Sequence, residues 1–135
     1  MRYPVILDKD GNGIFVHFPD IPEALTQGDN REDALFMARD ALLTAFEFYF
    51  EDNRPVPAPS VEGEDFISVP ASVAAKVILL NTMLEQGVTN AELARRMGIS
   101  PAAAQRVVTL GHATKIDTIE SALNALGKQL DLRAL

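Results

Sequence analysis

The sequence contains no cysteine. This absence excludes a disulfide framework and any metal site built from thiolates, and it is typical of a protein from a reducing compartment. Long hydrophobic runs are also missing, since the stretch Val77 to Leu80 is far too short to span a bilayer. The first residues, MRYPVILDKDGNG, reach two aspartates before an apolar run of signal-peptide length could form. We therefore expect a cytoplasmic protein without a membrane partner.

Recognisable catalytic motifs are absent as well. The sequence has no GxSxG, Walker A or HExxH element and no closely spaced pair of histidines. We therefore expect a protein that is not an enzyme and needs no cofactor. One alternative is a magnesium-dependent nuclease in which Asp8, Asp20 and Glu23 converge. His17 lies alone within a β-prone run, which favours a packed or hydrogen-bonded histidine over a catalytic or metal-binding one.

The segment DKDGNG resembles the start of a calcium-binding loop, because Asp8, Asp10 and Asn12 alternate before Gly13. Two features oppose calcium. Pro19 stands where such a loop needs a bidentate glutamate, and the flanking residues favour strands where helices are required. We therefore expect a hairpin turn and no metal site.

Basic residues are scarce in the first half of the chain. Residues 1–69 contain 14 Asp and Glu against 5 Lys and Arg, whereas residues 70–135 contain 5 against 7. The total net charge of −7 is therefore divided into −9 and +2. Opposite charges on two modules predict two partners, a basic protein for the first and DNA for the second. The alternative is that the acidic residues form a solvated surface without a partner.

The first half has β-prone runs and one long helical pattern, which predict a small sheet covered by a helix. The expected elements are strands at Tyr3–Leu7, Ile14–Phe18, Ala24–Gly28 and Phe66–Val69, and a helix at Arg31–Asp52. Asp29 or Asn30 should cap the helix, and a proline-containing connector at residues 53–65 should follow it. The helix should bury the stripe Leu35, Ala38, Leu42, Ala45 and Tyr49, widened by Leu43, Phe46 and Phe50. Core packing explains most of the aromatic cluster Phe46, Phe48, Tyr49 and Phe50, with a partner or dimer surface as the alternative.

The second half, residues 70–135, is helical throughout and predicts a small all-α domain. One helix should occupy Ala71–Glu85 and stop at Gly87. The last helix should occupy Ile116–Leu126, with Thr114 as its cap and Gly127 as its stop. The tail Leu130–Leu135 is apolar enough to dock on a neighbouring copy, which predicts a dimer contact.

Between these helices, Thr89 to Leu110 predicts two helices joined by a tight turn. Thr89 and Asn90 can cap the first helix, and its buried face is formed by Leu93, Ala94 and Met97. Gly98 and Ile99 form the turn, and Ser100 and Pro101 start the second helix as N-cap and first residue, with its end near Leu110. Ala104, Val107 and Val108 should face inward.

The outer face of the second helix carries the functional prediction. The side chains expected there are those of Ser100, Ala102, Gln105, Arg106 and Thr109. Glutamine can pair bidentately with adenine and arginine with guanine, so this face suits a DNA major groove. The alternative is a helical hairpin without a ligand.

Several segments together resemble the HicB antitoxins of HicAB toxin-antitoxin pairs, in the subtype with a C-terminal helix-turn-helix. The segments that carry the resemblance are MRYPV at 1–5, DIPEALTQG at 20–28, DALLTAF at 40–46, FYFEDN at 48–53, SVA at 72–74, ELARR at 92–96, HATKID at 112–117 and ALGK at 125–128. The DKDGNG turn and the segment PAAAQRVV lie outside them. The operator sequence therefore cannot be inferred from the resemblance.

The resemblance implies an α+β fold class. Residues 1–69 should form a partial ribonuclease H-like sheet-plus-helix domain that lacks nuclease activity and binds the toxin. Residues 70–135 should form an all-α helix-turn-helix domain of the lambda-repressor type. The implied partners are HicA, a small basic mRNA-cleaving protein, and the double-stranded operator DNA of its own operon, bound as a homodimer or homotetramer. The alternative is a stand-alone transcription regulator whose first domain binds a small ligand or mediates oligomerisation.

The resemblance implies where each partner binds, and the outer face of the second helix supplies the residues expected to contact DNA. DNA contacts are expected from the outer face already described, at Ser100, Ala102, Gln105, Arg106 and Thr109, with Arg95 and Lys115 as phosphate contacts. Toxin contacts are expected from the acidic surface around Asp20, Glu23, Glu47, Glu51 and Asp52.

Overall fold

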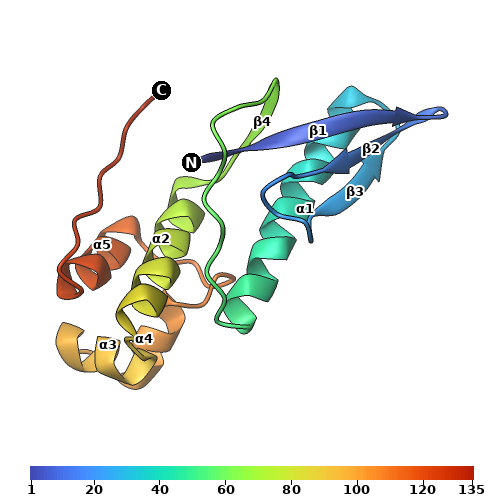
Figure 1. Cartoon of the computed structure of the whole chain (residues 1–135). Coiled ribbons are helices and arrows are strands. Elements are labelled where there is room, and N and C mark those ends of the chain that lie inside the picture. Colours follow the sequence, from blue (N-terminus) through green and yellow to red (C-terminus); the bar gives the residue numbers. More distant parts are fainter. The chain divides into compact units, whose positions relative to one another are not determined.

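A computed structural model describes all 135 residues of the chain. It contains a four-stranded antiparallel sheet and five helices, so the fold is mixed α and β. The chain separates into two compact units (Figure 1). The first unit consists of Met1–Tyr49 and Val56–Pro70, and the second consists of Phe50–Pro55 and Ala71–Leu135.

The sheet of the first unit has the order β3-β2-β1-β4, with every neighbouring pair antiparallel. Its strands are β1 at Arg2–Asp10, β2 at Gly13–His17, β3 at Leu25–Gly28 and β4 at Asp65–Ser68. Asp10 pairs with Gly13, so only two residues form the hairpin turn, and Gly11 supplies the positive φ of 61° that this turn needs. Strand β1 therefore extends three residues beyond the predicted end at Leu7, because the tight turn keeps its polar end paired with β2.

Helix α1, Arg31–Glu51, lies against one face of the sheet (Figure 1). Its start is capped as predicted, since Asn30 Oδ1 accepts a hydrogen bond from the Asp33 amide at 2.9 Å. The buried face differs by one position from the predicted stripe, because Ala34 is fully buried and Leu35 only half-buried. A Cβ on Gly28 would lie 2.4 Å from the Ala34 backbone nitrogen, so β3 and the first turn of α1 approach too closely for larger side chains.

The core of the first unit forms around Tyr3 of β1. Its ring contacts that of Phe46 on α1 edge to face at 5.5 Å, and its hydroxyl donates to the Pro57 carbonyl at 2.7 Å. Burial, aided by the charge of Asp20, raises the pKa of Tyr3 to about 12. The connector after α1 is thus fastened to the sheet, and Val56 beside it is also buried.

The second unit is helical from Ala71 onward. Its helices are α2 at Ala71–Gln86, α3 at Asn90–Met97, α4 at Pro101–Val107 and α5 at Ile116–Ala125. They enclose a core that includes Leu79, Met83, Leu93, Val107, Ile119 and Leu123. The Gln86 side chain also joins α2 to the end of α5 by donating to the Leu126 carbonyl at 2.9 Å.

Two predicted boundaries in this unit are wrong. Helix α4 ends at Val107, three residues before Leu110, where Lys76 of α2 donates to the carbonyls of Arg106 and Thr109. Thr114 does not cap α5. Its hydroxyl points to the carbonyls of Arg106 and His112, and the N-cap position falls to Lys115 without a side-chain hydrogen bond.

No helix in the chain is both long and apolar enough to cross a membrane. The tail after α5 has no regular secondary structure, and its Leu132 and Leu135 side chains are exposed.

Candidate functional site

The pair α3 and α4 is shaped by its local sequence. Thr89 caps α3, and its hydroxyl accepts from the Glu92 amide at 3.2 Å. Gly98 ends this helix in the left-handed region at φ 67°, a conformation that disfavours other side chains. Ser100 caps α4 by accepting from the Ala103 amide at 3.1 Å, and Pro101 is its first residue. Each of these predicted caps is confirmed, and together they join two short helices by a tight turn.

The two sides of α4 differ as the sequence predicts. Ala104 and Val107 are buried in the core, whereas the opposite side faces solvent. The exposed residues there are Ser100, Ala102, Gln105, Arg106 and Thr109. This side of α4 therefore presents small and polar side chains around one arginine to solvent.

Gln105 is held in one orientation by residues on both sides. Its Oε1 accepts a hydrogen bond from Asn90 Nδ2 at 2.7 Å, and its Nε2 lies 3.4 Å from Thr109 Oγ1. The Thr109 hydroxyl in turn donates to the Gln105 carbonyl at 2.6 Å. The sequence predicts Asn90 only as a cap, because this contact joins amides 15 residues apart in sequence.

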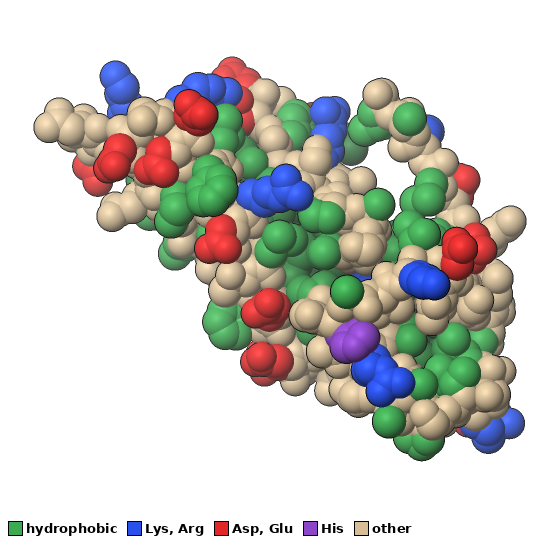
Figure 2. Space-filling view, turned by 180° about the vertical axis from the view of Figure 1, so that it is seen from behind, with side chains coloured by type: hydrophobic (Ala, Val, Ile, Leu, Met, Phe, Trp, Pro, Cys, Tyr) green, Lys and Arg blue, Asp and Glu red, His purple; other side chains and the backbone are tan.

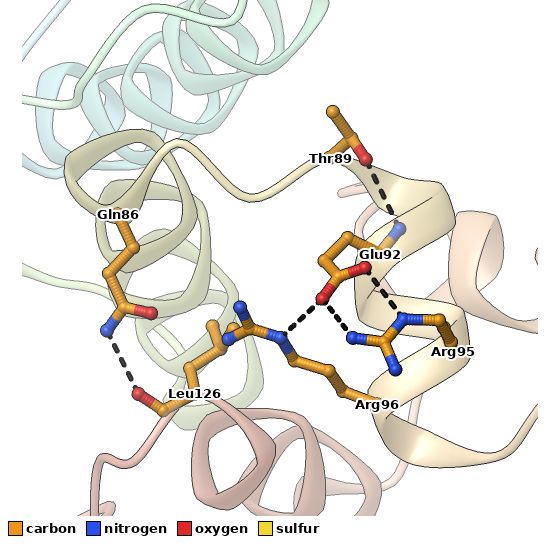
Figure 3. Close-up of polar contacts among 6 residues, drawn as sticks. All are labelled: Gln86, Thr89, Glu92, Arg95, Arg96 and Leu126. Atoms are coloured by element: carbon orange, nitrogen blue, oxygen red, sulfur yellow. Dashed lines mark hydrogen bonds and ion pairs between the residues drawn. The ribbon is translucent and has the colours of Figure 1, made fainter.

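Two arginines of α3 share one carboxylate (Figure 3). Arg95 donates to both Glu92 oxygens at 2.9 and 2.6 Å, and Arg96 Nε donates to Glu92 Oε1 at 2.9 Å. These hydrogen bonds lower the pKa of Glu92 to about 2. The cluster keeps one net positive charge, and the Arg95 side chain remains 73% exposed.

Lys76 of α2 is a buried charge that sequence reasoning missed. It is only 3% exposed, and its Nζ donates to the carbonyls of Arg106, Thr109 and His112 at 3.3, 2.6 and 2.5 Å. Burial lowers the pKa of Lys76. The lysine therefore holds the connection between α4 and α5, which also carries the exposed Lys115. In the sequence, the only sign of this buried charge is that a single lysine interrupts an apolar stretch of α2.

The acidic residues predicted to bind a toxin have different local roles. Asp20 accepts from the amide and hydroxyl of Ser60 at 2.9 and 2.6 Å, and Glu23 accepts from the Tyr49 hydroxyl at 2.6 and 3.0 Å. Both therefore support the fold. The remaining residues, Glu47, Glu51 and Asp52, are exposed carboxylates on and just after the last turns of α1. The structure groups Glu51 and Asp52 with the second unit. Figure 2 shows acidic side chains gathered over the part of the surface formed by the first unit.

The carboxylates of the metal-dependent alternatives do not converge. Asp8 lies 3.2 Å from His17, while Asp20 and Glu23 are engaged by Ser60 and Tyr49. No group of three or more His, Cys, Asp or Glu residues in the chain could hold a metal ion. His17 is a hydrogen-bonded strand histidine, as the sequence favours.

Comparison with known proteins assigns the family. A family model described as HicB_like antitoxin of bacterial toxin-antitoxin system matches residues 2–78. Antitoxin HicB 2 of Photorhabdus laumondii is 64% identical over 135 residues, which cover 100% of this chain and 97% of the relative. Antitoxin HicB of Escherichia coli K12 is 53% identical over 135 residues, which cover 98% of each chain. The chain belongs to the HicB antitoxin family.

The HicB relationship extends over both units. The family model takes in the first unit and the first half of α2, and the relatives align along nearly the whole chain. A more divergent relative, Antitoxin HicB of Pseudomonas fluorescens, is 38% identical over 96% of this chain and 90% of its own length. The chain therefore has an antitoxin function of the HicB type. Its relatives are named as antitoxins and not as enzymes, in agreement with the prediction from its motifs.

Proposed function

We propose that the chain neutralises a HicA-type toxin through its acidic N-terminal region, residues 1–69, and represses its own operon through residues 70–135. Membership of the HicB antitoxin family carries the first half of the proposal. The charge division of −9 and +2 supports both halves, because a basic toxin and DNA require opposite fields. Both partners would be met in the cytoplasm.

The DNA half assigns α3 and α4 to a helix-turn-helix of the lambda-repressor type. In this arrangement α4 enters the major groove and presents Gln105 and Arg106 to the bases. The Arg106 guanidinium makes no ion pair within the chain, so its donors are available to guanine. The remaining contacts are assigned to Ser100, Ala102 and Thr109 on the same face, with Arg95 and Lys115 on phosphates.

The toxin half assigns residues 1–69 to a partial ribonuclease H-like domain without nuclease activity. Its surplus of carboxylates attracts a basic toxin and covers the surface that binds RNA. The residues assigned to this acidic surface are Asp20, Glu23, Glu47, Glu51 and Asp52. Among them, Glu47, Glu51 and Asp52 are exposed and so contribute most directly to the field outside the molecule.

Operator binding as a homodimer or homotetramer completes the proposal. A two-fold symmetric protein matches a palindromic operator with one recognition helix for each half-site. The exposed tail supports such an assembly, since Leu132 and Leu135 are 64% and 90% exposed and would be covered by a neighbouring copy.

The test is co-expression of the full chain with the small reading frame next to its gene. We expect growth arrest by the neighbour alone, relief by the chain, a stable complex on purification, and binding of the chain to its own promoter DNA. A harmless neighbour that forms no complex would contradict the toxin half. Promoter binding without such a complex would leave a stand-alone regulator.

A further inference from the structure

The sheet of the first unit has one face that no helix covers, and the connector reaches it only at Pro4, where Gly63 packs. Side chains alternate along β1, and Tyr3 and Val5 point toward α1, so Ile6 and Asp8 point away from it. The strand register continues this outer face across β2 and β3. One row is formed by Ile6, His17 and Leu25, and the next by Asp8, Phe15 and Gln27.

Three large apolar side chains are exposed together on this face. Ile6 is 38%, Phe15 39% and Leu25 57% exposed. Directly opposite residues on neighbouring strands have Cβ atoms about 5 Å apart, so these side chains and His17 form one continuous surface. We call Ile6, Phe15, His17 and Leu25 the sheet patch.

Contacts within the face orient two members of the sheet patch, His17 and Phe15. His17 Nε2 lies 3.2 Å from Asp8 Oδ2, and its ring stacks on that of Phe15 with centroids 5.8 Å apart and an interplanar angle of 27°. Side chains fixed on strands lose little freedom when a partner binds, which favours their use as binding anchors.

The outer face of α1 differs from the sheet patch. It exposes Phe36 and Phe48, which are 73% and 50% exposed. The two are 12 residues apart in sequence, or about 18 Å along a helix, so each is a single exposed residue. Single exposed apolar residues are ordinary at a protein surface, whereas a continuous patch marks an interaction site.

The charge around the sheet patch specifies the kind of partner. Asp8 lies within the outer face with its side chain 62% exposed, and Asp10 follows at the end of β1. Residues 1–69 as a whole carry −9. An apolar centre within a negative field fits a basic protein that presents an apolar contact of its own.

We propose that the sheet patch is the docking surface for the basic toxin. This inference rests on the proposed antitoxin function and moves the centre of the toxin contact from the acidic end of α1 to the open face of the sheet. The exposed carboxylates Glu47, Glu51 and Asp52 then attract the toxin over a distance and accelerate its association. Contacts at Phe15 and Leu25 slow its dissociation.

The test measures the Kd of full-length variants for the toxin encoded beside the gene, produced as a catalytically inactive variant. Leu25→Asp and the milder Phe15→Ala should each weaken binding about tenfold or more. The matched control Phe36→Asp changes a more exposed apolar residue of the same unit and should leave the Kd within about twofold. Denaturant unfolding of each variant shows that the fold is kept.

Protection of an introduced cysteine from labelling is a second measurement, and it does not depend on the folding stability of a variant. The chain has no cysteine, so Leu25→Cys and Phe36→Cys each introduce one unique thiol. The toxin should slow maleimide labelling at position 25 and leave it unchanged at position 36. Equal protection at both positions, or at position 36 alone, would overturn the proposal. So would sheet-patch variants that bind toxin like wild type, or that change only the oligomeric state of the chain without toxin. Failure of the wild-type chain to bind the toxin would instead contradict the proposed function itself.

Discussion

At the scale of single residues, Lys76 links the core of the second unit to its candidate DNA-binding face. Its ammonium group is buried without a carboxylate, and three backbone carbonyls take the place of a counter-ion. Such a charge is costly to desolvate and is stable only while all its donors are satisfied. The segment after α4 is therefore shaped around this one side chain.

Replacing this lysine should destabilise the second unit. Lys76→Met keeps the length of the side chain but removes the donors for the Arg106, Thr109 and His112 carbonyls. We expect a loss of about 1–3 kcal/mol in the free energy of unfolding, measured by denaturant titration. Lys128→Met, an exposed lysine just after α5, is the matched control and should change it by less than about 0.5 kcal/mol. Equal effects of the two changes would contradict the role of Lys76.

At the scale of elements, α3 is a short helix whose charges are arranged to stabilise it. Glu92 lies in the first turn, where the helix dipole favours a carboxylate, and Arg95 and Arg96 lie in the last. Both arginines also reach back to Glu92, at spacings of three and four residues that bring side chains together on a helix. Helix α3 thus has an N-terminal turn stabilised by Glu92 and an exposed side with a net positive charge.

The Glu92 cluster should make α3 sensitive to acid. The pKa of Glu92 is lowered from 4.5 to about 2, so its contribution to stability is complete above pH 4.5 and is lost as the pH falls toward 2. Glu92→Gln should therefore reduce the difference in unfolding free energy between pH 6 and pH 3, measured by denaturant titration at both values. Glu120→Gln removes an exposed carboxyl of α5 as the control. An unchanged pH dependence in Glu92→Gln would refute the assignment.

At the scale of the whole molecule, two compact units carry opposite charge and, in our proposal, separate functions. Each has its own core, around Tyr3 and Phe46 in the first and around Leu93 and Ile119 in the second. Substitutions on the surface of one unit lie outside the core of the other, and their effects should be largely independent. The two proposed activities can therefore be separated by mutation.

Arg106→Ala should separate operator binding from neutralisation of the toxin. It removes the exposed arginine of α4 and should cost about 1–3 kcal/mol in operator binding, with relaxed preference at the base it reads. Neutralisation of the toxin in the growth assay should remain at the wild-type level. Arg133→Ala, in the exposed tail, controls for loss of one positive charge from the same unit. The measurement is operator affinity, by titration at fixed salt. Equal affinity of wild type and Arg106→Ala would show that Arg106 does not read a base.

Much of the fold could be predicted because its signals are local. The caps at Asn30, Thr89 and Ser100 depend on contacts between residues three positions apart, which a short stretch of sequence contains in full. The predicted ends of β1 and α4 were each displaced by three residues. Those ends depend on partners elsewhere in the chain, on the pairing of β1 with β2 and on Lys76 for the segment after α4.

The sequence alone determined the division of charge, the helical second half, the exposed side of α4 and membership of the HicB antitoxin family. Composition, periodicity and local motifs contain the first three of these properties, and similarity along the chain to known antitoxins establishes the fourth. Only the tertiary structure decided that Asp20 and Glu23 support the fold, that Lys76 holds the segment after α4, and that the sheet leaves one apolar face open. These features join residues 26 to 40 positions apart, or neighbouring strands in a given register. Such contacts are set by how the chain folds back on itself, and no local pattern encodes them.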